Sequence, residues 1–225
     1  MTEQTKRFIE CCCTSAVEAA EAAAGGASRV ELCEELQVGG VTPRERNLRE
    51  TLKKCSLPVN VLIRPRGGDF VYNEAEKEAV LQSIRLCKSL SVNGVVIGGL
   101  TPEGDIDIPL MRELIAAAKP LSTTFHRAFD ECRDPFKALE EIIALGFDRI
   151  LTSGQAPNAP EGADLLAQLV RKAAGRIVIM PGAGVRPSNI AKLESVTGAS
   201  EFHSSAHGPS GATDRLTVRL LVESR

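Results

Sequence analysis

Short apolar runs alternate along this chain with longer segments in which apolar residues recur at helical spacing. Such alternation of strand-length and helix-length segments is typical of βα units and a parallel sheet. Val80, Ile84 and Cys87 recur at helical spacing and predict one buried helix stripe. The apolar runs predict eight strands, at Arg7–Cys12, Arg29–Leu32, Val59–Arg64, Gly94–Ile97, Ser122–His126, Arg149–Leu151, Ile177–Met180 and Glu201–Ser204.

Helix start and stop signals fall between these runs. A side-chain oxygen followed by a first-turn proline or a glutamate three residues on can satisfy the free N–H groups of a helix start. Gly25 and Gly146 stand where helices should end. The predicted N-caps are Ser15 with Glu18, Thr42 with Pro43 and Glu45, Asn73 with Glu76, and Asp134 with Pro135.

Eight strands and their helices within 225 residues predict one α/β domain, residues 1–225, with the (β/α)8 TIM-barrel fold. Few residues follow Ser205, so we expect a short or incomplete last βα unit, with its helix within Asp214–Glu223. A doubly wound open sheet is the alternative fold, and the lack of a long crossover favours the barrel.

Charge and composition exclude several partners. A net charge of -2 provides no positive field for nucleic acid or an acidic membrane. No apolar run reaches membrane-spanning length. The polar start, Met1–Arg7, lacks the apolar core of a signal peptide, so we expect a cytoplasmic protein. Seven cysteines without a CxxC pair argue against a disulfide framework or a zinc ribbon and predict reduced thiols.

The functional site of a (β/α)8 barrel is built at the carboxyl ends of its strands, here called the barrel mouth. Alternate side chains of a strand point to the same face. If the apolar set faces the helices, Glu10 and Cys12 of the first strand point inward. Glu31 and Cys33 of the second strand then do the same, so one Glu-x-Cys pattern occurs twice on neighbouring strands.

Further polar residues follow the other strands. His126 shares the inward face with Thr124, while Phe125 faces the helices. Glycines after the seventh strand let backbone N–H groups approach an anion, which makes a phosphate site one interpretation of this turn. The candidates are Arg64, Arg66 and Asp69 after the third strand, His126, Arg127 and Asp130 after the fifth, Gly182 and Gly184 after the seventh, and His203 and Ser204 at the eighth.

Several stretches together resemble the copper homeostasis protein CutC family. The resemblance implies a (β/α)8 barrel that forms a homo-oligomer, a dimer or a tetramer, and that binds Cu(I) in cytosolic copper handling. It also implies that the metal-binding thiols are Cys12 and Cys33. The stretches are Glu-Leu-Cys from Glu31, Gly-Gly-Val-Thr-Pro from Gly39, Ile-Arg-Pro-Arg-Gly-Gly-Asp-Phe from Ile63, Thr-Phe-His-Arg-Ala-Phe-Asp from Thr124, Arg-Ile-Leu-Thr-Ser-Gly from Arg149, Met-Pro-Gly-Ala-Gly from Met180 and Glu-Phe-His-Ser-Ser-Ala from Glu201.

Two functions stay open. In the first, Cys12 and Cys33 bind a copper ion, because soft thiolates suit Cu(I). In the second, the protein is a lyase- or isomerase-type enzyme that acts on a small anionic or phosphorylated metabolite. There His126 is the acid or base, oriented by Glu10, Glu31, Asp69 or Asp130, and Arg64, Arg66 and Arg127 bind the anion. A copper carrier needs the thiols, whereas an enzyme needs the arginines and the histidine.

Overall fold

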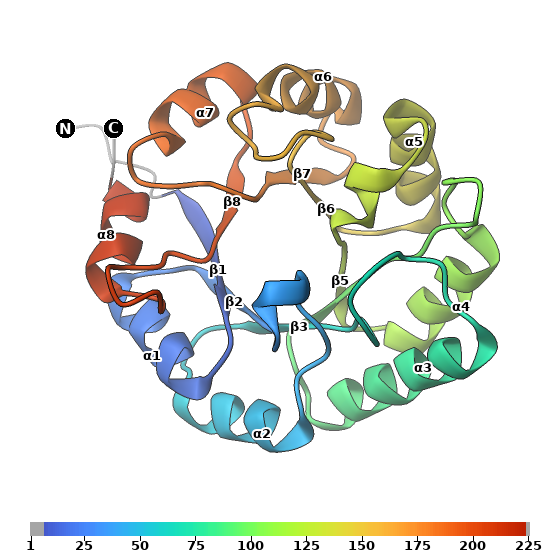
Figure 1. The fold of residues 1–225 in the computed structure, drawn as a ribbon, viewed down its shortest axis with the longest axis horizontal. Coiled ribbons are helices and arrows are strands. Elements are labelled where there is room, and N and C mark those ends of the chain that lie inside the picture. The colour runs from blue at the N-terminus through green and yellow to red at the C-terminus, as the bar shows by residue number, and fades with distance from the viewer. Residues whose placement is uncertain (1–6, 224–225) are drawn as a thin grey trace.

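The computed structural model describes residues 7–223, in which eight parallel strands alternate with helices. The strands form one sheet in the order β7-β6-β5-β4-β3-β2-β1-β8. Strands β7 and β8, at the two ends of that order, lie side by side, so the sheet curves into a nearly closed barrel inside a ring of helices (Figure 1). The (β/α)8 prediction is confirmed, and the doubly wound open sheet is excluded.

Predicted and observed strand ends agree to within two residues. The strands are β1 (Phe8–Cys13), β2 (Arg29–Leu32), β3 (Val59–Leu62), β4 (Gly94–Ile97), β5 (Ser122–Phe125), β6 (Arg149–Thr152), β7 (Val178–Pro181) and β8 (Glu201–Ser204). The helices are α1 (Ala16–Gly25), α2 (Glu45–Lys54), α3 (Glu74–Ser89), α4 (Ile108–Ala118), α5 (Pro135–Leu145), α6 (Ala163–Ala173), α7 (Ile190–Thr197) and α8 (Arg215–Glu223). Two short 3₁₀ helices, η1 (Leu36–Val38) and η2 (Arg127–Glu131), follow β2 and β5.

Strand register decides which side chains meet inside the barrel. Strand β1 pairs with β2 so that Cys12 lies opposite Glu31, and with β8 so that Glu10 lies opposite His203. Side chains of the other face pack against the helices in the main core. A second, small apolar cluster lies inside the barrel and consists of Cys12, Cys33, Leu62 and Val96.

Most predicted helix caps are confirmed. Asn73 and Glu76 form a full capping box at α3, because each side chain accepts a hydrogen bond from the other's backbone N–H. Asp134 caps α5, and Gly146, with φ of 84°, ends it. At α1 the Ser15 hydroxyl accepts from the backbone of Glu18, but the Glu18 carboxylate accepts from Thr14 instead, so that box is half formed.

The predicted N-cap at Thr42 is wrong. Helix α2 begins at Glu45 after Arg44, and no side chain caps it. The Thr42 hydroxyl instead donates to the carbonyl of Arg64 at 3.1 Å and accepts from its backbone N–H at 2.9 Å. These bonds tie the loop after β2 to the end of β3, because the extended chain at Arg64 has free backbone groups there.

The last βα unit is short, as predicted, but it contains its helix. Asp214 accepts a hydrogen bond from the backbone of Thr217 at 2.8 Å, at the start of α8. Helix α8 packs against α1 and closes the helical ring (Figure 1). None of the helices within residues 7–223 combines the length and the apolar character that crossing a bilayer requires.

Candidate functional site

A cavity of about 670 Å³ opens at the barrel mouth. Its walls come from the ends of the strands and the loops that follow them, and the loop that carries η1 lies over the barrel centre (Figure 1). The charged, imidazole and thiol side chains of the wall are Cys12, Glu31, Cys33, Arg64, His126, Arg127, Asp130, Glu131, Arg186 and His203.

Two thiols meet in this wall. The sulfur atoms of Cys12 and Cys33 lie 3.5 Å apart, on the inward face that strand alternation predicts. The contact between the thiols, together with burial, raises the pKa of Cys12 well above its ordinary value, so the Cys12 thiol is protonated at neutral pH. Two bonds of about 2.3 Å can join one ion to sulfur atoms up to about 4.6 Å apart. The spacing of the pair and its soft donors therefore fit a single thiophilic ion.

A carboxylate and an imidazole stand beside the thiols. Ligand atoms of Cys12, Glu31 and His203 lie within 4.8 Å of one another. Nε2 of His203 is 3.4 Å from a carboxylate oxygen of Glu31. Burial raises the pKa of Glu31 to about 7, although the charge of His203 opposes this. Burial lowers the pKa of His203, but the charge of Glu31 and the hydrogen bond to Glu10 outweigh burial and raise it.

Glu10 lies beneath the cavity rather than in its wall and is fully buried. It accepts hydrogen bonds from Nδ1 of His203 at 2.8 Å and from Nε of Arg29. Arg29 also pairs with Glu201 at 2.7 Å, and Arg149 pairs with Glu201 at 2.8 Å. Burial opposes ionisation of Glu10, but the bond from His203 and the charge of Arg29 lower its pKa to about 2.

Arg29 was not among the predicted site residues. Arg29 shares the inward face of β2 with Glu31 and Cys33, so extending the same alternation two residues towards the strand start would have predicted it. Its role here is to keep the Glu10 carboxylate ionised below the mouth.

The guanidinium of Arg64 holds loops together. It donates to the backbone carbonyls of Val38 at 3.0 Å, Gly40 at 3.2 Å and Gly68, and it lies over the ring of Phe70 at 4.6 Å. Its Nε is buried and has no hydrogen-bond partner among the described residues. Arg64 therefore lines the cavity, but most of its donors are already used by the protein.

His126 packs on the same phenylalanine, with 4.9 Å between its ring centroid and that of Phe70. Its Nδ1 accepts a hydrogen bond from the backbone N–H of Ala128 at 3.2 Å, which places the proton of the neutral ring on Nε2. That Nε2 is buried without a partner in the described part of the chain. Burial and then the charge of Arg64 lower the pKa of His126 to about 3, so the ring is neutral at physiological pH.

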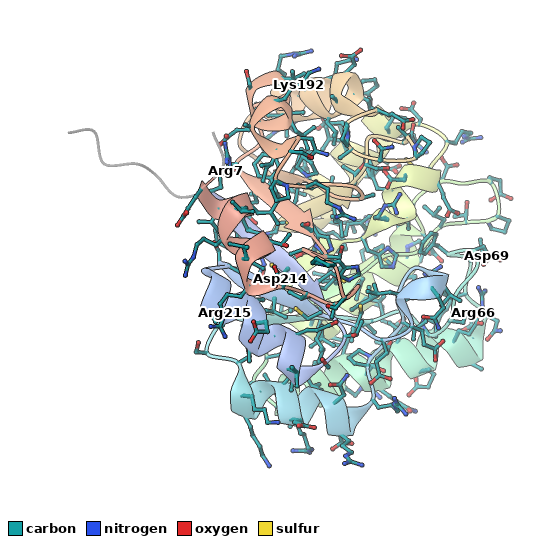
Figure 2. The ribbon with its side chains drawn as sticks, turned by 60° about the vertical axis from the view of Figure 1, so that its left-hand side comes forward. Arg7, Arg66, Asp69, Lys192, Asp214 and Arg215 are labelled. Atoms are coloured by element: carbon teal, nitrogen blue, oxygen red, sulfur yellow. The ribbon has the colours of Figure 1, made fainter. Side chains whose placement is uncertain are left out.

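The structure does not bring every candidate to the cavity. Arg66 and Asp69 lie at the outer edge of the molecule, and neither lines the cavity (Figure 2). Arg66 donates to the Asp69 carboxylate at 2.9 Å and also pairs with Glu76. The turn after β3 directs this pair outward, so the two residues serve the loop rather than the mouth.

The remaining candidates line or support the rim. Arg127 pairs with Asp130 at 2.8 Å, and that carboxylate also accepts from the backbone of Ser153. Gly184 and Ser204 line the cavity. Gly182 lies behind them, where an added Cβ would be 2.5 Å from the Leu151 side chain. Its small size is thus required by packing against β6.

Comparison with known proteins identifies the family. The model of the CutC family matches residues 7–208. The chain belongs to the CutC family. A CutC family protein of Parabacteroides distasonis is 59% identical over 202 residues, which cover 89% of this chain and 83% of that protein. A CutC family protein of Bacteroides thetaiotaomicron is 50% identical over 204 residues, which cover 89% and 81%. The resemblance predicted from the motifs is confirmed.

Solved structures agree with this assignment. CutC of Streptococcus agalactiae, described by its name as a copper homeostasis protein, superposes with a TM-score of 0.84 at 34% identity and covers 88% of this chain and 98% of its own. Phosphoribosylanthranilate isomerase of Thermotoga maritima superposes with a TM-score of 0.63 at 14% identity over 97% and 98% of the two chains. The second likeness shows the shared barrel fold alone.

Proposed function

We propose that this CutC protein binds Cu(I) through the thiolates of Cys12 and Cys33 and serves in copper homeostasis. The observation that carries the proposal is the 3.5 Å separation of the two buried sulfur atoms at the barrel mouth. Soft thiolates select Cu(I) over harder cations. Leu36, Leu62 and Val96 pack around the pair. Binding releases the thiol protons to solvent, because thiolates are the metal ligands.

The same proposal covers location and assembly. All seven cysteines are free thiols, a state that a reducing cytoplasm maintains. We therefore place the protein in the cytoplasm, with the copper ion as its partner. A homo-oligomer, dimer or tetramer, completes the proposal, and sedimentation of the reduced protein measures that state.

A competition titration tests copper binding. Reduced protein is titrated with Cu(I) against a chelator of known affinity. Loss of a hydrogen-bond partner of a metal ligand costs about 10–100-fold in affinity, and we expect the Cys12→Ser, Cys33→Ser double variant to lose more than that. The Cys55→Ser, Cys132→Ser double variant is the control and keeps wild-type affinity. Equal affinity of both double variants overturns the proposal.

A second function, an enzyme that acts on a small anionic or phosphorylated metabolite, is supported by one observation. The Nε2–H of His126 and the Nε–H of Arg64 are buried without hydrogen-bond partners within residues 7–223, and both residues line the cavity of about 670 Å³. A buried donor without an acceptor costs about 1–3 kcal/mol. An oxyanion in the cavity would satisfy such donors, and Gly184 and Ser204 line the opposite rim.

A thermal-shift screen of phosphorylated sugars and small organic acids tests this second function. His126→Phe removes the donor but keeps an aromatic ring against Phe70. We expect a ligand that stabilises the wild type to lose its effect on this variant, whereas Arg66→Ala, outside the cavity, keeps the shift. A screen in which no anion stabilises the wild type, or in which His126→Phe responds fully, contradicts the enzyme function.

A further inference from the structure

We infer that the barrel mouth also binds a divalent ion of the zinc class, with Cys12, Cys33, Glu31 and His203 as its four ligands. The inference rests on the thiol pair proposed above as a metal site. It adds to that pair a carboxylate and an imidazole, which copper(I) does not require.

Two contacts in this cluster have the length of an edge of a tetrahedral site. Zinc bonds of about 2.0–2.3 Å to sulfur, nitrogen and oxygen place neighbouring ligand atoms about 3.3–3.8 Å apart at tetrahedral angles. The two sulfur atoms are 3.5 Å apart, and Nε2 of His203 is 3.4 Å from the Glu31 carboxylate. Ligand atoms of Cys12, Glu31 and His203 all lie within 4.8 Å of one another, and Cys33 joins this group through its contact with the sulfur of Cys12.

Glu10 orients the imidazole for this role. The hydrogen bond between Nδ1 of His203 and Glu10, 2.8 Å long, leaves Nε2 facing Glu31 as the ring nitrogen that can bind an ion in exchange for its proton. A carboxylate that accepts the distal N–H of a ligating histidine is the usual arrangement at protein metal sites. Glu10 is itself fixed by Arg29 and by the side-chain amide of Asn60 at 3.3 Å. The supporting contacts of a metal ligand are therefore already in place.

The donor set also favours a divalent ion by its chemistry. A lone pair of Nε2 and a carboxylate oxygen that face each other at 3.4 Å repel unless a cation or a proton lies between them. Two thiolates and one carboxylate can neutralise a divalent charge, and sulfur, nitrogen and oxygen ligands together are typical of zinc. The four residues are at most 8% exposed.

Cobalt(II) is the spectroscopic probe for this site. We expect Co²⁺ to give the near-ultraviolet charge-transfer bands of a cobalt–thiolate bond and the intense visible bands of tetrahedral cobalt. Glu31→Gln and His203→Asn should each weaken Co²⁺ and Zn²⁺ binding by at least about 10–100-fold and should weaken Cu(I) binding by less than that. Asp69→Asn, a carboxylate outside the cavity, is the matched control and should change neither affinity.

The outcomes separate the two proposals. Retained Cu(I) binding that still requires the thiols shows that Glu31→Gln and His203→Asn are folded. If Cu(I) binding requires the thiols but Co²⁺ binds these two variants as tightly as the wild type, the divalent site is wrong and the copper site stands. A Co²⁺ spectrum without thiolate bands would likewise contradict the divalent site and leave the copper site standing. If Cu(I) also binds the cysteine double variant unchanged, both proposals are wrong.

Discussion

Glu10 and His203, 193 positions apart in the chain, meet inside the barrel through a 2.8 Å hydrogen bond. Pairing of the first strand with the last places them opposite one another. The contact turns Nε2 of His203 towards Glu31, which lies next to the thiol of Cys12. Pairing of β1 with β8 therefore brings the imidazole of His203 to the candidate metal site.

Removing the Glu10 carboxylate should destabilise the fold strongly. Glu10→Gln leaves the buried guanidinium of Arg29 with Glu201 as its one ionic partner among residues 7–223. Loss of one member of a buried ion pair costs about 3–5 kcal/mol, because the other charge stays buried. Equilibrium unfolding in urea measures this free energy. Glu50→Gln, which breaks an exposed pair with Lys54, is the control and should leave the unfolding midpoint unchanged.

Stability should fall in acid because of His126. Burial and the charge of Arg64 lower its pKa from 6.5 to about 3 in the folded state. Between these values the unfolded chain binds more protons, so the free energy of unfolding rises with pH, by about 1.4 kcal/mol per unit at most. Above pH 6.5 both states are neutral and the contribution is constant.

The variant His126→Gln isolates this effect, because glutamine does not titrate. We expect the wild type to lose about 1.4 kcal/mol relative to the variant between pH 5.5 and 4.5. Urea unfolding at each pH measures the difference. Parallel stability curves for the two proteins would show that His126 takes up its proton without unfolding.

Periodicity predicted the barrel and three of the four residues of the proposed metal cluster. Alternation of apolar and polar residues in short strands fixes which face points inward, and this placed Glu10, Cys12, Glu31 and Cys33 correctly on the inner face. The pattern works because a parallel strand in a barrel packs one face against helices and the other against the interior.

The alternation of apolar and polar residues does not predict where the side chains of loop residues point. Arg64 donates to carbonyls of two loops, and Arg66 turns outward to Asp69. Both arginines follow one strand, and their directions depend on the turn between them rather than on any period. Thr42 likewise bonds to Arg64 instead of capping a helix. Contacts between residues distant in sequence decide these positions.

The cysteines should differ in how fast their thiols are alkylated. Cys55 is half-buried, whereas the other six are buried in the native state. Burial raises the pKa of Cys11, Cys87 and Cys132 to about 12, and a thiol without thiolate reacts slowly. Brief alkylation followed by mass spectrometry should label Cys55 first in native protein and all seven cysteines in urea. Equal labelling of Cys55 and Cys87 without denaturant would contradict the packing described.

A side chain at Gly98 should destabilise the fold. An added Cβ would lie 2.6 Å from two ring atoms of His126, and a ring packed on Phe70 cannot move away cheaply. Gly98→Ala should therefore cost about 1–3 kcal/mol, the usual effect of overpacking. In a His126→Ala background the same change should cost less, because the clash is gone. Urea unfolding measures both losses of stability. Equal losses in the two backgrounds would show that the added methyl group does not clash with His126.

X-ray absorption at the copper edge tests most directly whether Cys12 and Cys33 bind Cu(I). Reduced protein is loaded with one equivalent of Cu(I), and the same is done with the Cys12→Ser, Cys33→Ser double variant. We predict that sulfur neighbours dominate the first shell of the wild type and are lost from the variant. A wild-type shell of nitrogen and oxygen alone, or a sulfur shell that persists in the variant, would contradict a copper site at these two thiols.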